Sequence, residues 1–406
     1  MTLIECFNNA LVENVAVCLE LKPDKLILLG NEEELEDIET RYNALFEERK
    51  LSVEIKTEPI GDDRLSDITK LLAKIICQEG ECVIDLTDAD EIPAMAVGAT
   101  LMQLEPSLRR KVCVQKFDPH TDTITTLMGT PSPAMPGAEL TVKELVALFG
   151  GIVYPNSYQP PMNYTPLQLE GLWQTMHAFT PKKWNRMLTN LAEFESRSKD
   201  KMHIRVNLDS LRGEIGEFDE KLGRVQILLE ALRKKGVVLY RKDDHILDYK
   251  YTDPLYRYCT QKAGNTLEIK VLLEARSLKE QGCSFFTDCQ TSVHIDWDGH
   301  VHKISDNIPD TNNEIDLILM HGVTPLFISC KNGDVEEEEL YKLHTVAREF
   351  GGPNVRKMLV ATSLSKHDPS HKALIRRAWD MDIYPVTGFT KFTSEDWQDT
   401  FRDALW

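Results

Sequence analysis

The sequence predicts an α/β protein in three parts: an amino-terminal doubly wound sheet, a helical, winged-helix-like connector and a carboxyl-terminal α/β domain. Strand-length apolar segments alternate with helical segments five times before residue 120, which is typical of a parallel sheet with helices on both faces. The chain has 406 residues, and single hydrophobic cores stop growing near about 250–300 residues. We therefore expect domains at 1–145, 146–255 and 256–406.

The elements of the first domain follow from short apolar runs that are closed by turn residues. Because ligands of parallel sheets bind at the carboxyl ends of the strands, the segments 7–11, 59–63 and 86–92 are candidate ligand loops. No Gly-x-Gly-x-x-Gly follows the first strand, so we expect no dinucleotide cofactor. The strands are expected at 2–7, 25–29, 52–59, 82–85 and 112–118, with helices at 11–21, 31–45, 66–77 and 93–104.

The connector contains a helix followed by a hairpin. Residues 218–235 form an amphipathic helical pattern, and 236–249 predicts a hairpin that turns at Asp243 and Asp244. This order resembles a fragment of a winged helix. Such a fragment either contacts nucleic-acid phosphates or serves as a structural linker. Five basic residues lie near the hairpin: Arg233, Lys234, Lys235, Arg241 and Lys242.

The carboxyl-terminal domain carries acidic and basic residues on two expected strands. Glu314 and Asp316 are two residues apart in the segment 313–320, so a strand projects both from one face. Ser329 and Lys331 share a face of the segment 326–331 in the same way. The chain turns at His321, so the strands are antiparallel neighbours and Asp316 approaches Lys331. The other interpretation is a surface hairpin with an Asp–Lys salt bridge.

The first interpretation has a chemical meaning. Hydrolysis of a phosphodiester requires a hard divalent cation held by carboxylates, because the cation neutralises charge that develops on the phosphate oxygens. A lysine stabilises the developing anion or activates the attacking water. Glu268, on an expected helix that begins near Thr266, is a further metal ligand or a residue that orients metal-bound water.

These segments together resemble a known family. The matching stretches are 264–268, 313–316, 327–331, 340–343, 350–352 and 357–360, with 2–30 and Asp85–Thr87 at the amino-terminal end. They resemble the CRISPR-associated Rossmann-fold (CARF) nucleases of type III CRISPR systems, which carry a restriction-endonuclease-like domain. The resemblance implies a homodimer that binds a cyclic oligoadenylate, usually cyclic tetra-adenylate, and then cuts DNA or single-stranded RNA with Mn²⁺ or Mg²⁺.

The resemblance also implies roles for particular residues. Catalysis is assigned to Asp316, Lys331, Ser329, Glu314 and Glu268, and metal binding to Asp316, Glu314 and Glu268. Activator binding is assigned to Asn8, Asn9, Ala10, Leu11, Thr87, Asp88, Ala89, Asp90 and Glu91. The chain departs from the family at two places. Ser329 stands where the common core has an acid, and Asp88–Ala89 stand where relatives often have two glycines. A hydroxyl is a poor ligand beside a carboxylate, so we expect Glu314 and Glu268 to complete the metal site.

The composition limits the other functions. The net charge is −18, of which residues 1–150 carry −14, residues 151–250 carry +3 and residues 251–406 carry −7. This charge argues against a protein that coats nucleic acid. No apolar run is long enough to span a membrane, no leader is apparent, and the nine cysteines include no Cys-x-x-Cys pair, so we expect a cytoplasmic protein.

Three further features remain. The histidines near the Asp298 turn (His294, His300 and His302) are expected to be solvated, as is the acidic run 336–339. Six bases between 356 and 377 either hold nucleic acid or form a solvated surface. The alternative function is a non-catalytic cyclic-oligoadenylate sensor or transcriptional regulator, which the connector hairpin and Ser329 favour.

Overall fold

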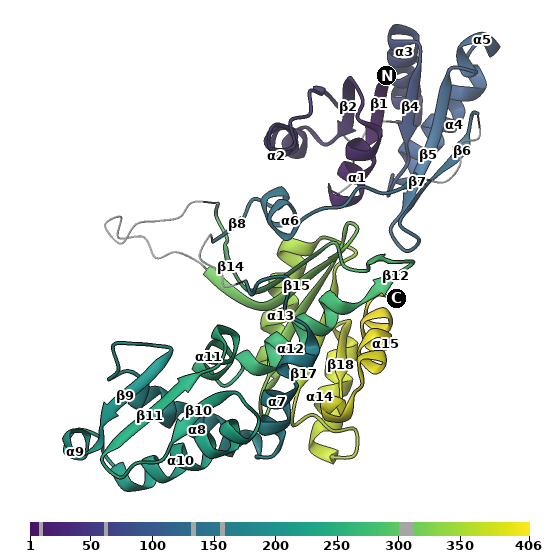
Figure 1. Cartoon of the computed structure of the whole chain (residues 1–406). Coiled ribbons are helices and arrows are strands. Elements are labelled where there is room, and N and C mark those ends of the chain that lie inside the picture. Colours follow the sequence, from purple (N-terminus) through teal and green to yellow (C-terminus); the bar gives the residue numbers. More distant parts are fainter. Residues whose placement is uncertain (8–10, 61–63, 131–134, 155–158, 300–311) are drawn as a thin grey trace.

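The computed structural model describes residues 1–7, 11–60, 64–130, 135–154, 159–299 and 312–406, and it divides into three regions (Figure 1). The amino-terminal sheet lies at one end of the molecule, a larger mixed sheet lies in the middle, and a small module with a three-stranded sheet lies at the other end. No helix within the described ranges is both long and apolar enough to cross a bilayer.

The amino-terminal region is the expected doubly wound sheet. Its strands follow the order β3-β2-β1-β4-β5-β6-β7, with β1 to β5 parallel and β6 and β7 antiparallel. Because the order reverses between β1 and β4, the switch point of this fold lies there. The strands are β1 (Thr2–Cys6), β2 (Lys25–Gly30), β3 (Glu54–Pro59), β4 (Cys82–Asp85), β5 (Val112–Asp118), β6 (Thr123–Met128) and β7 (Met135–Pro136).

Helices cover both faces of this sheet. The apolar side chains of α1 and α2 join those of Leu3 and Leu28 in one core, whereas α3 and α4 pack on Ile4 and Ile27. Alternate residues of each strand therefore serve opposite cores, which is why the strands are nearly continuous apolar runs. The helices are α1 (Leu11–Leu21), α2 (Glu32–Glu48), α3 (Leu65–Glu79), α4 (Glu91–Gln103) and the short α5 (Pro106–Arg109).

The small module has winged-helix topology. Its antiparallel sheet has the order β10-β11-β9, so the first strand pairs with the last. The hairpin expected from the sequence is β10 and β11, and α10 precedes it as expected. The elements are α8 (Pro181–Glu195), β9 (His203–Asn207), α9 (Leu208–Leu211), α10 (Phe218–Lys234), β10 (Val238–Arg241) and β11 (Ile246–Tyr251), followed by α11 (Pro254–Gln261).

The central sheet has the order β18-β17-β16-β15-β14-β8. Side chains of α12, α15 and α7 pack on one face of it, and those of α13 and α14 pack on the other. Its strands are β14 (Asp288–Asp296), β15 (Asn312–His321), β16 (Thr324–Lys331), β17 (Arg356–Ala361), β18 (Ile383–Val386) and β8 (Ile152–Val153). The helices are α7 (Pro166–His177), α12 (Asn265–Ser277), α13 (Glu337–Gly351), α14 (Pro369–Asp380) and α15 (Ser394–Leu405).

Two features of this sheet differ from the sequence analysis. Strand β8 and helix α7 lie within the range expected for the connector, yet β8 pairs with β14 and α7 packs against α12. The range 292–297 was expected to form a hairpin with 300–304. Instead, β14 pairs with β15 and β8, and the rest of that expected hairpin, including His300 and His302, lies outside the described residues.

The first sheet and the central sheet share a junction built around α6 (Val142–Leu148), which lies between them in Figure 1. One apolar core runs from α1 through α6 to Phe327 and Phe350 of the carboxyl-terminal region. The Arg49 guanidinium pairs with Glu144 on α6 (Nε–Oε1 2.6 Å). This apolar junction gives a packed contact between the two sheets rather than a loose linker.

Candidate functional site

The site begins with the pairing of β15 and β16. Leu317 lies opposite Ile328 in this antiparallel pair, which places Asp316 beside Ser329 at the end of the ladder. The backbone N–H of Cys330 donates to Asp316 Oδ2 at 2.6 Å, and Ser329 Oγ donates to the same oxygen at 3.3 Å. Ser329 therefore orients the carboxylate of Asp316 in this arrangement.

A small hollow opens beside these strands. The structure places Glu314, Asp316, Ser329 and Lys331 along it, as the sequence analysis expected. It adds Glu339 from α13, whose Oε2 lies 2.9 Å from Lys331 Nζ. The side chains of Lys331 and Glu339 are 30% and 34% exposed, so the ion pair is reached from solvent.

Glu339 is the residue of this hollow that the sequence analysis missed. The run 336–339 was expected to be the solvated first turn of a helix, and the glutamates before Glu339 are indeed exposed. A pattern was visible in the sequence, because Glu339 lies four residues before Leu343 and thus on the same side of the helix. Leu343 is buried and lines the hollow with Glu339.

Burial and mutual repulsion set the charge of the acids. Burial raises the pKa of Glu268 to about 8, and the carboxylates of Asp316 and Glu314 contribute. Burial also raises the pKa of Asp316, although the N–H of Cys330 and the charge of Lys331 oppose the shift. Burial lowers the pKa of Lys331, but Asp316 and Glu339 more than offset it, so this pKa is raised and the amine stays protonated.

The carboxylates of Glu314, Asp316 and Glu268 are suitable ligands for a hard divalent cation, but they do not surround a single position. Carboxylate oxygens are the ligands that Mg²⁺ and Mn²⁺ prefer. Glu268 lies on α12 and acts on Asp316 electrostatically, but it does not line the hollow. Within the described residues, no three His, Cys, Asp or Glu side chains lie close enough together to hold one ion. The residue types expected for a metal site are therefore present, but among the described residues their side chains are not close enough together to hold one ion.

Two other expected features have partial outcomes. His294 lies 3.7 Å from Glu314 (Nε2–Oε1) and is 41% exposed. Among the bases of 356–377, the Lys357 side chain is buried and Arg377 lies over the ring of Tyr341, so this stretch is not a uniformly free basic surface.

The expected activator loops lie at the switch point of the first sheet. Leu11 and Thr87 are buried, whereas Asp88, Asp90 and Glu91 are exposed and Ala89 is half-buried. The remaining three expected residues, Asn8, Asn9 and Ala10, lie outside the described residues.

The side chain of Thr87 has a structural contact inside the first domain. Its Oγ1 donates to Asp85 Oδ1 at 2.8 Å and accepts from the backbone N–H of Phe117 at 2.9 Å. Thr87 therefore ties β4 to β5, and the exposed side chains after it face solvent.

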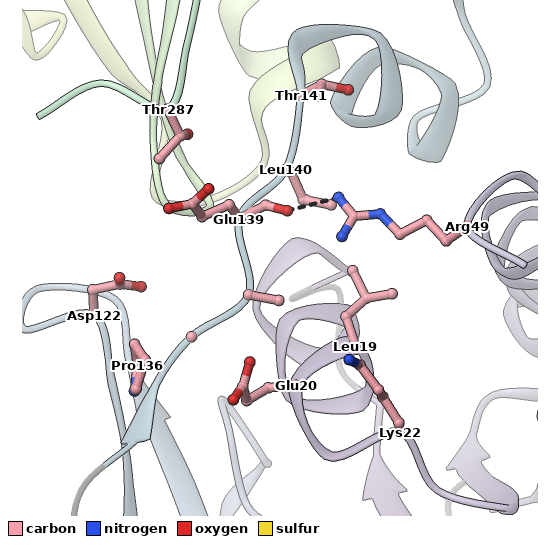
Figure 2. A pocket seen from close by; sticks show the side chains of 12 residues that line it. Leu19, Glu20, Lys22, Arg49, Asp122, Pro136, Glu139, Leu140, Thr141 and Thr287 are labelled. Atoms are coloured by element: carbon pink, nitrogen blue, oxygen red, sulfur yellow. Dashed lines mark hydrogen bonds between the residues drawn. The ribbon is translucent and has the colours of Figure 1, made fainter. Parts of the chain in front are cut away.

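A hollow of about 490 Å³ lies where the first domain meets the carboxyl-terminal domain (Figure 2). Arg49 Nη2 donates to the backbone oxygen of Glu139 at 2.7 Å. Asp122, at the tip of the β5–β6 hairpin, lines the same hollow, and burial together with the Glu139 carboxylate raises its pKa to about 7.

The tip of the β5–β6 hairpin reaches the strand pair that carries the candidate catalytic residues. Gly322, in the turn between β15 and β16, packs so closely on Asp122 that an added Cβ would lie 2.9 Å from its Oδ1. Gly322 also has a φ of +59° and accepts a hydrogen bond from Leu140 N at 3.1 Å. The first domain therefore contacts the β15–β16 hairpin directly.

The fold and the hollow define a protein in which a Rossmann-like domain is packed on a restriction-endonuclease-like α/β domain with a winged-helix module. Protein VC1899 from Vibrio cholerae has this fold over 100% of this chain and 97% of its own, with a TM-score of 0.70 and 15% identity. Can2 from Sulfobacillus thermosulfidooxidans, solved in complex with cyclic tetra-adenylate, covers 100% and 99%, with a TM-score of 0.62 and 15% identity.

A third solved structure is described as a type III CRISPR defence DNA nuclease activated by cyclic oligoadenylate. It aligns with 100% of this chain and 51% of its own, with a TM-score of 0.48 and 15% identity. No protein-family model matches the sequence, and no curated protein matches it either. The full-length likeness to VC1899 and Can2 confirms the three-part fold expected from the resemblance to CARF nucleases.

Proposed function

We propose that this protein is a metal-dependent nuclease that a cyclic oligoadenylate activates in type III CRISPR defence. The observation that carries the proposal is the position of Asp316 and Lys331 on the neighbouring strands β15 and β16, where both line one open hollow. The full-length likeness to Can2, which was solved with cyclic tetra-adenylate, supports the choice of activator. The substrate is DNA or single-stranded RNA.

The five residues expected to carry catalysis would have different chemical tasks. Asp316, Glu314 and Glu268 would hold Mn²⁺ or Mg²⁺, which when bound neutralises charge on the phosphate that is attacked. The ammonium of Lys331 is placed to stabilise the anion that develops there. Ser329 supplies no charge, but its hydrogen bond fixes the Asp316 carboxylate.

The activator would bind at the switch point, between the loops 8–11 and 87–91. From there, a change in the first domain has a short route to the nuclease hollow. The β5–β6 hairpin contacts the turn at Gly322, and Gly322 joins the strands that carry Asp316 and Lys331. A rotation of the first domain would therefore act on β15 and β16 directly.

A homodimer is part of the proposal, and α4 supports it. This helix follows the loop 87–91 and exposes Ile92 (50%), Met95 (58%) and Met102 (75%) on one side. Gly98 and Ala99 lie between them, so a second copy of α4 can approach closely. We expect Met95→Glu to convert a dimer to monomers in analytical ultracentrifugation, whereas Met162→Glu, at a 77% exposed site elsewhere, leaves the dimer intact.

A second candidate function is a non-catalytic sensor. Ser329 in the place of an acid favours it, as does the absence of three converging metal ligands among the described residues. In this case the protein would bind the activator and nucleic acid but cut neither DNA nor RNA.

One experiment separates the two candidates. Pure protein is incubated with Mn²⁺ and supercoiled plasmid, single-stranded DNA or RNA, with and without cyclic tetra-adenylate. The nuclease proposal predicts cutting that depends on the activator and is lost in Lys331→Ala but not in Lys391→Ala, an exposed lysine of the same domain. Absence of cutting with every cyclic oligoadenylate and metal would leave only the sensor.

A further inference from the structure

The outer face of the three-stranded sheet in the winged-helix module is basic and has no covering element among the described residues. The strand register places Lys250 between Leu239 and His203, and Asp248 between Arg241 and Arg205. The alternate residues, including Ile204, Val206 and Tyr249, are buried against the helices of the module. The sheet is therefore apolar on one side and charged on the other.

Four of the six side chains in these two rows are Lys, Arg or His. Asp248 is the acid among them, and it pairs with His203 (Oδ1–Nε2 2.8 Å) and with Arg205 at 4.0 Å. Arg241 and Lys250 are exposed, and neither forms an ion pair with any residue that the structure describes. A hollow of about 460 Å³ lies along this face and extends to Arg233 at the end of α10.

The helical side of the same module has the opposite electrostatic character. Helix α10 begins with Asp219 and Glu220, at the end that winged-helix proteins commonly place in the major groove. Its neighbouring bases are already paired with acids of the module, as in Arg212 with Asp219 (3.2 Å) and Arg224 with Glu220. Charge complementarity thus favours the sheet face over the helix as the surface for a polyanion.

The module is also fixed to the strand that carries the candidate catalytic lysine. Asn185 on α8 and Asn332, the residue after Lys331, exchange two hydrogen bonds: Asn185 Nδ2 to Asn332 O at 2.9 Å and Asn332 Nδ2 to Asn185 Oδ1 at 2.8 Å. Thr362 Oγ1 donates to Asn332 Oδ1 at 3.0 Å. A ligand held by the module would therefore keep a defined position relative to β16.

We propose that the outer face of this sheet, through Arg205, Arg241 and Lys250, binds the phosphate backbone of the nucleic acid that the nuclease domain cuts. That the bound nucleic acid is then cut rests on the proposed nuclease function, whereas its binding to this face does not. In a chain with a net charge of −18, such a local surface lets a polyanion dock without a generally basic protein. Because the contacts are to phosphates, binding is independent of sequence and sensitive to salt.

The test measures binding without cutting. The full chain is titrated into fluorescent 30-nucleotide single- and double-stranded DNA and RNA, in EDTA and at several salt concentrations, and the anisotropy gives the dissociation constant. The triple variant Arg205→Gln, Arg241→Gln and Lys250→Gln is compared with a matched variant of the helical side, Arg186→Gln, Arg197→Gln and Arg212→Gln. Thermal unfolding confirms that both variants are folded.

The slope of log K for binding against log salt concentration is negative. We expect the sheet variant to reduce its magnitude by about 2–3, since each of the three phosphate contacts contributes about 0.7–0.9. The helical-side variant keeps the wild-type slope. Equal slopes in the sheet variant and the wild type, or no wild-type binding at low salt, would overturn the proposal. Because the binding is measured in EDTA, where no divalent metal supports cutting, a failure of catalysis is distinguished from a failure of this surface.

Discussion

Each of the two α/β domains buries a group of acids at the ends of neighbouring strands, and the two groups differ in how their charge is balanced. In the carboxyl-terminal domain, Asp316 accepts hydrogen bonds from β16 and faces Lys331 beside an open hollow. In the first domain, Glu5 and Asp85 lie opposite each other on β1 and β4 and are fully buried. Neither carboxylate oxygen of Glu5 has a hydrogen-bond partner among the described residues.

The difference shows which acids can work as anions. A buried carboxylate without a cation is costly, so it takes up a proton instead. Burial raises the pKa of Glu5 well above its usual range, and the charge of Asp85 adds to the shift. Burial raises the pKa of Asp85 to about 7. Glu5 and Asp85 of the first domain are therefore largely neutral below pH 7, whereas Lys331 and the Cys330 N–H help Asp316 to ionise.

The largest effect is expected at Asp316. In Asp316→Asn the amide oxygen still accepts from Cys330 N, so the fold is kept, but the anionic oxygen is lost. We expect activator-dependent cutting to fall by about 10²–10³-fold, measured as the initial rate of plasmid nicking. Asp399→Asn, an exposed acid on α15, is the control. A wild-type rate in Asp316→Asn would show that the Asp316 carboxylate is structural rather than catalytic.

The next effect concerns Asp85 and stability. Its pKa is higher in the folded chain than in the unfolded chain, so the unfolded state releases its proton first as the pH rises. The neutral acid therefore contributes to the free energy of unfolding fully below about pH 4, and this contribution is lost as the pH rises to about 7. The loss lowers the free energy of unfolding by at most about 4 kcal/mol.

In Asp85→Asn this loss is absent, because the amide stays neutral and its oxygen still accepts from Thr87. Urea unfolding at pH 4.5 and 7.5 measures the difference, with the exposed Asp67→Asn as the control. If the wild type and Asp85→Asn lose the same stability between these pH values, the group in the first domain is ionised in the folded chain and the contrast between the two domains fails.

The smallest effect is expected at one hydrogen bond between the first domain and the carboxyl-terminal domain. Asn354 Nδ2, between α13 and β17, donates to Glu13 Oε1 on α1 at 2.6 Å. Asn354→Ala removes this bond, which is worth about 0.5–1.5 kcal/mol. We expect the cyclic tetra-adenylate concentration for half-maximal cutting to change by about 2–10-fold, with the rate at saturation unchanged.

The control for this contact is Glu349→Ala, an exposed position on α13. An unchanged half-maximal concentration in Asn354→Ala would mean that the contact between α1 and the carboxyl-terminal domain transmits nothing from the activator.

Local patterns in the sequence predicted most of the fold and several of the polar residues that line the hollow beside β15 and β16. The alternation of apolar runs predicted β1 to β5. The two-residue period predicted that Glu314 and Asp316 share one face of their strand and that Ser329 and Lys331 share one face of the next, because both patterns depend on nearby residues alone. The spacing of Glu339 and Leu343 indicates the inner side of α13, but the contact of Glu339 with Lys331 depends on how α13 packs over β16, which that spacing does not define. Strand β8 was missed because two residues are too short to show any period.

Glu5 and Asp85 could have been found. Glu5 lies inside an apolar run that was assigned to a strand, Ile4-Glu5-Cys6, and Asp85 ends another, directly after Ile84. A charged residue inside such a run is a sign of a buried acid. In the first domain, the roles expected from the sequence fell instead on the loop residues that follow the first and fourth strands.

Strand β8 shows that the carboxyl-terminal domain is built from two separate stretches of the chain. Because β8 pairs with β14 and α7 packs against α12, the central α/β domain includes residues from about 152 on, and the winged-helix module is an insertion between α7 and α12. Both ends of the module return to one body, which restricts it more than a tether at one end would. A fragment that starts at residue 256 would lack β8 and expose the edge of β14, and unprotected edges of this kind promote aggregation.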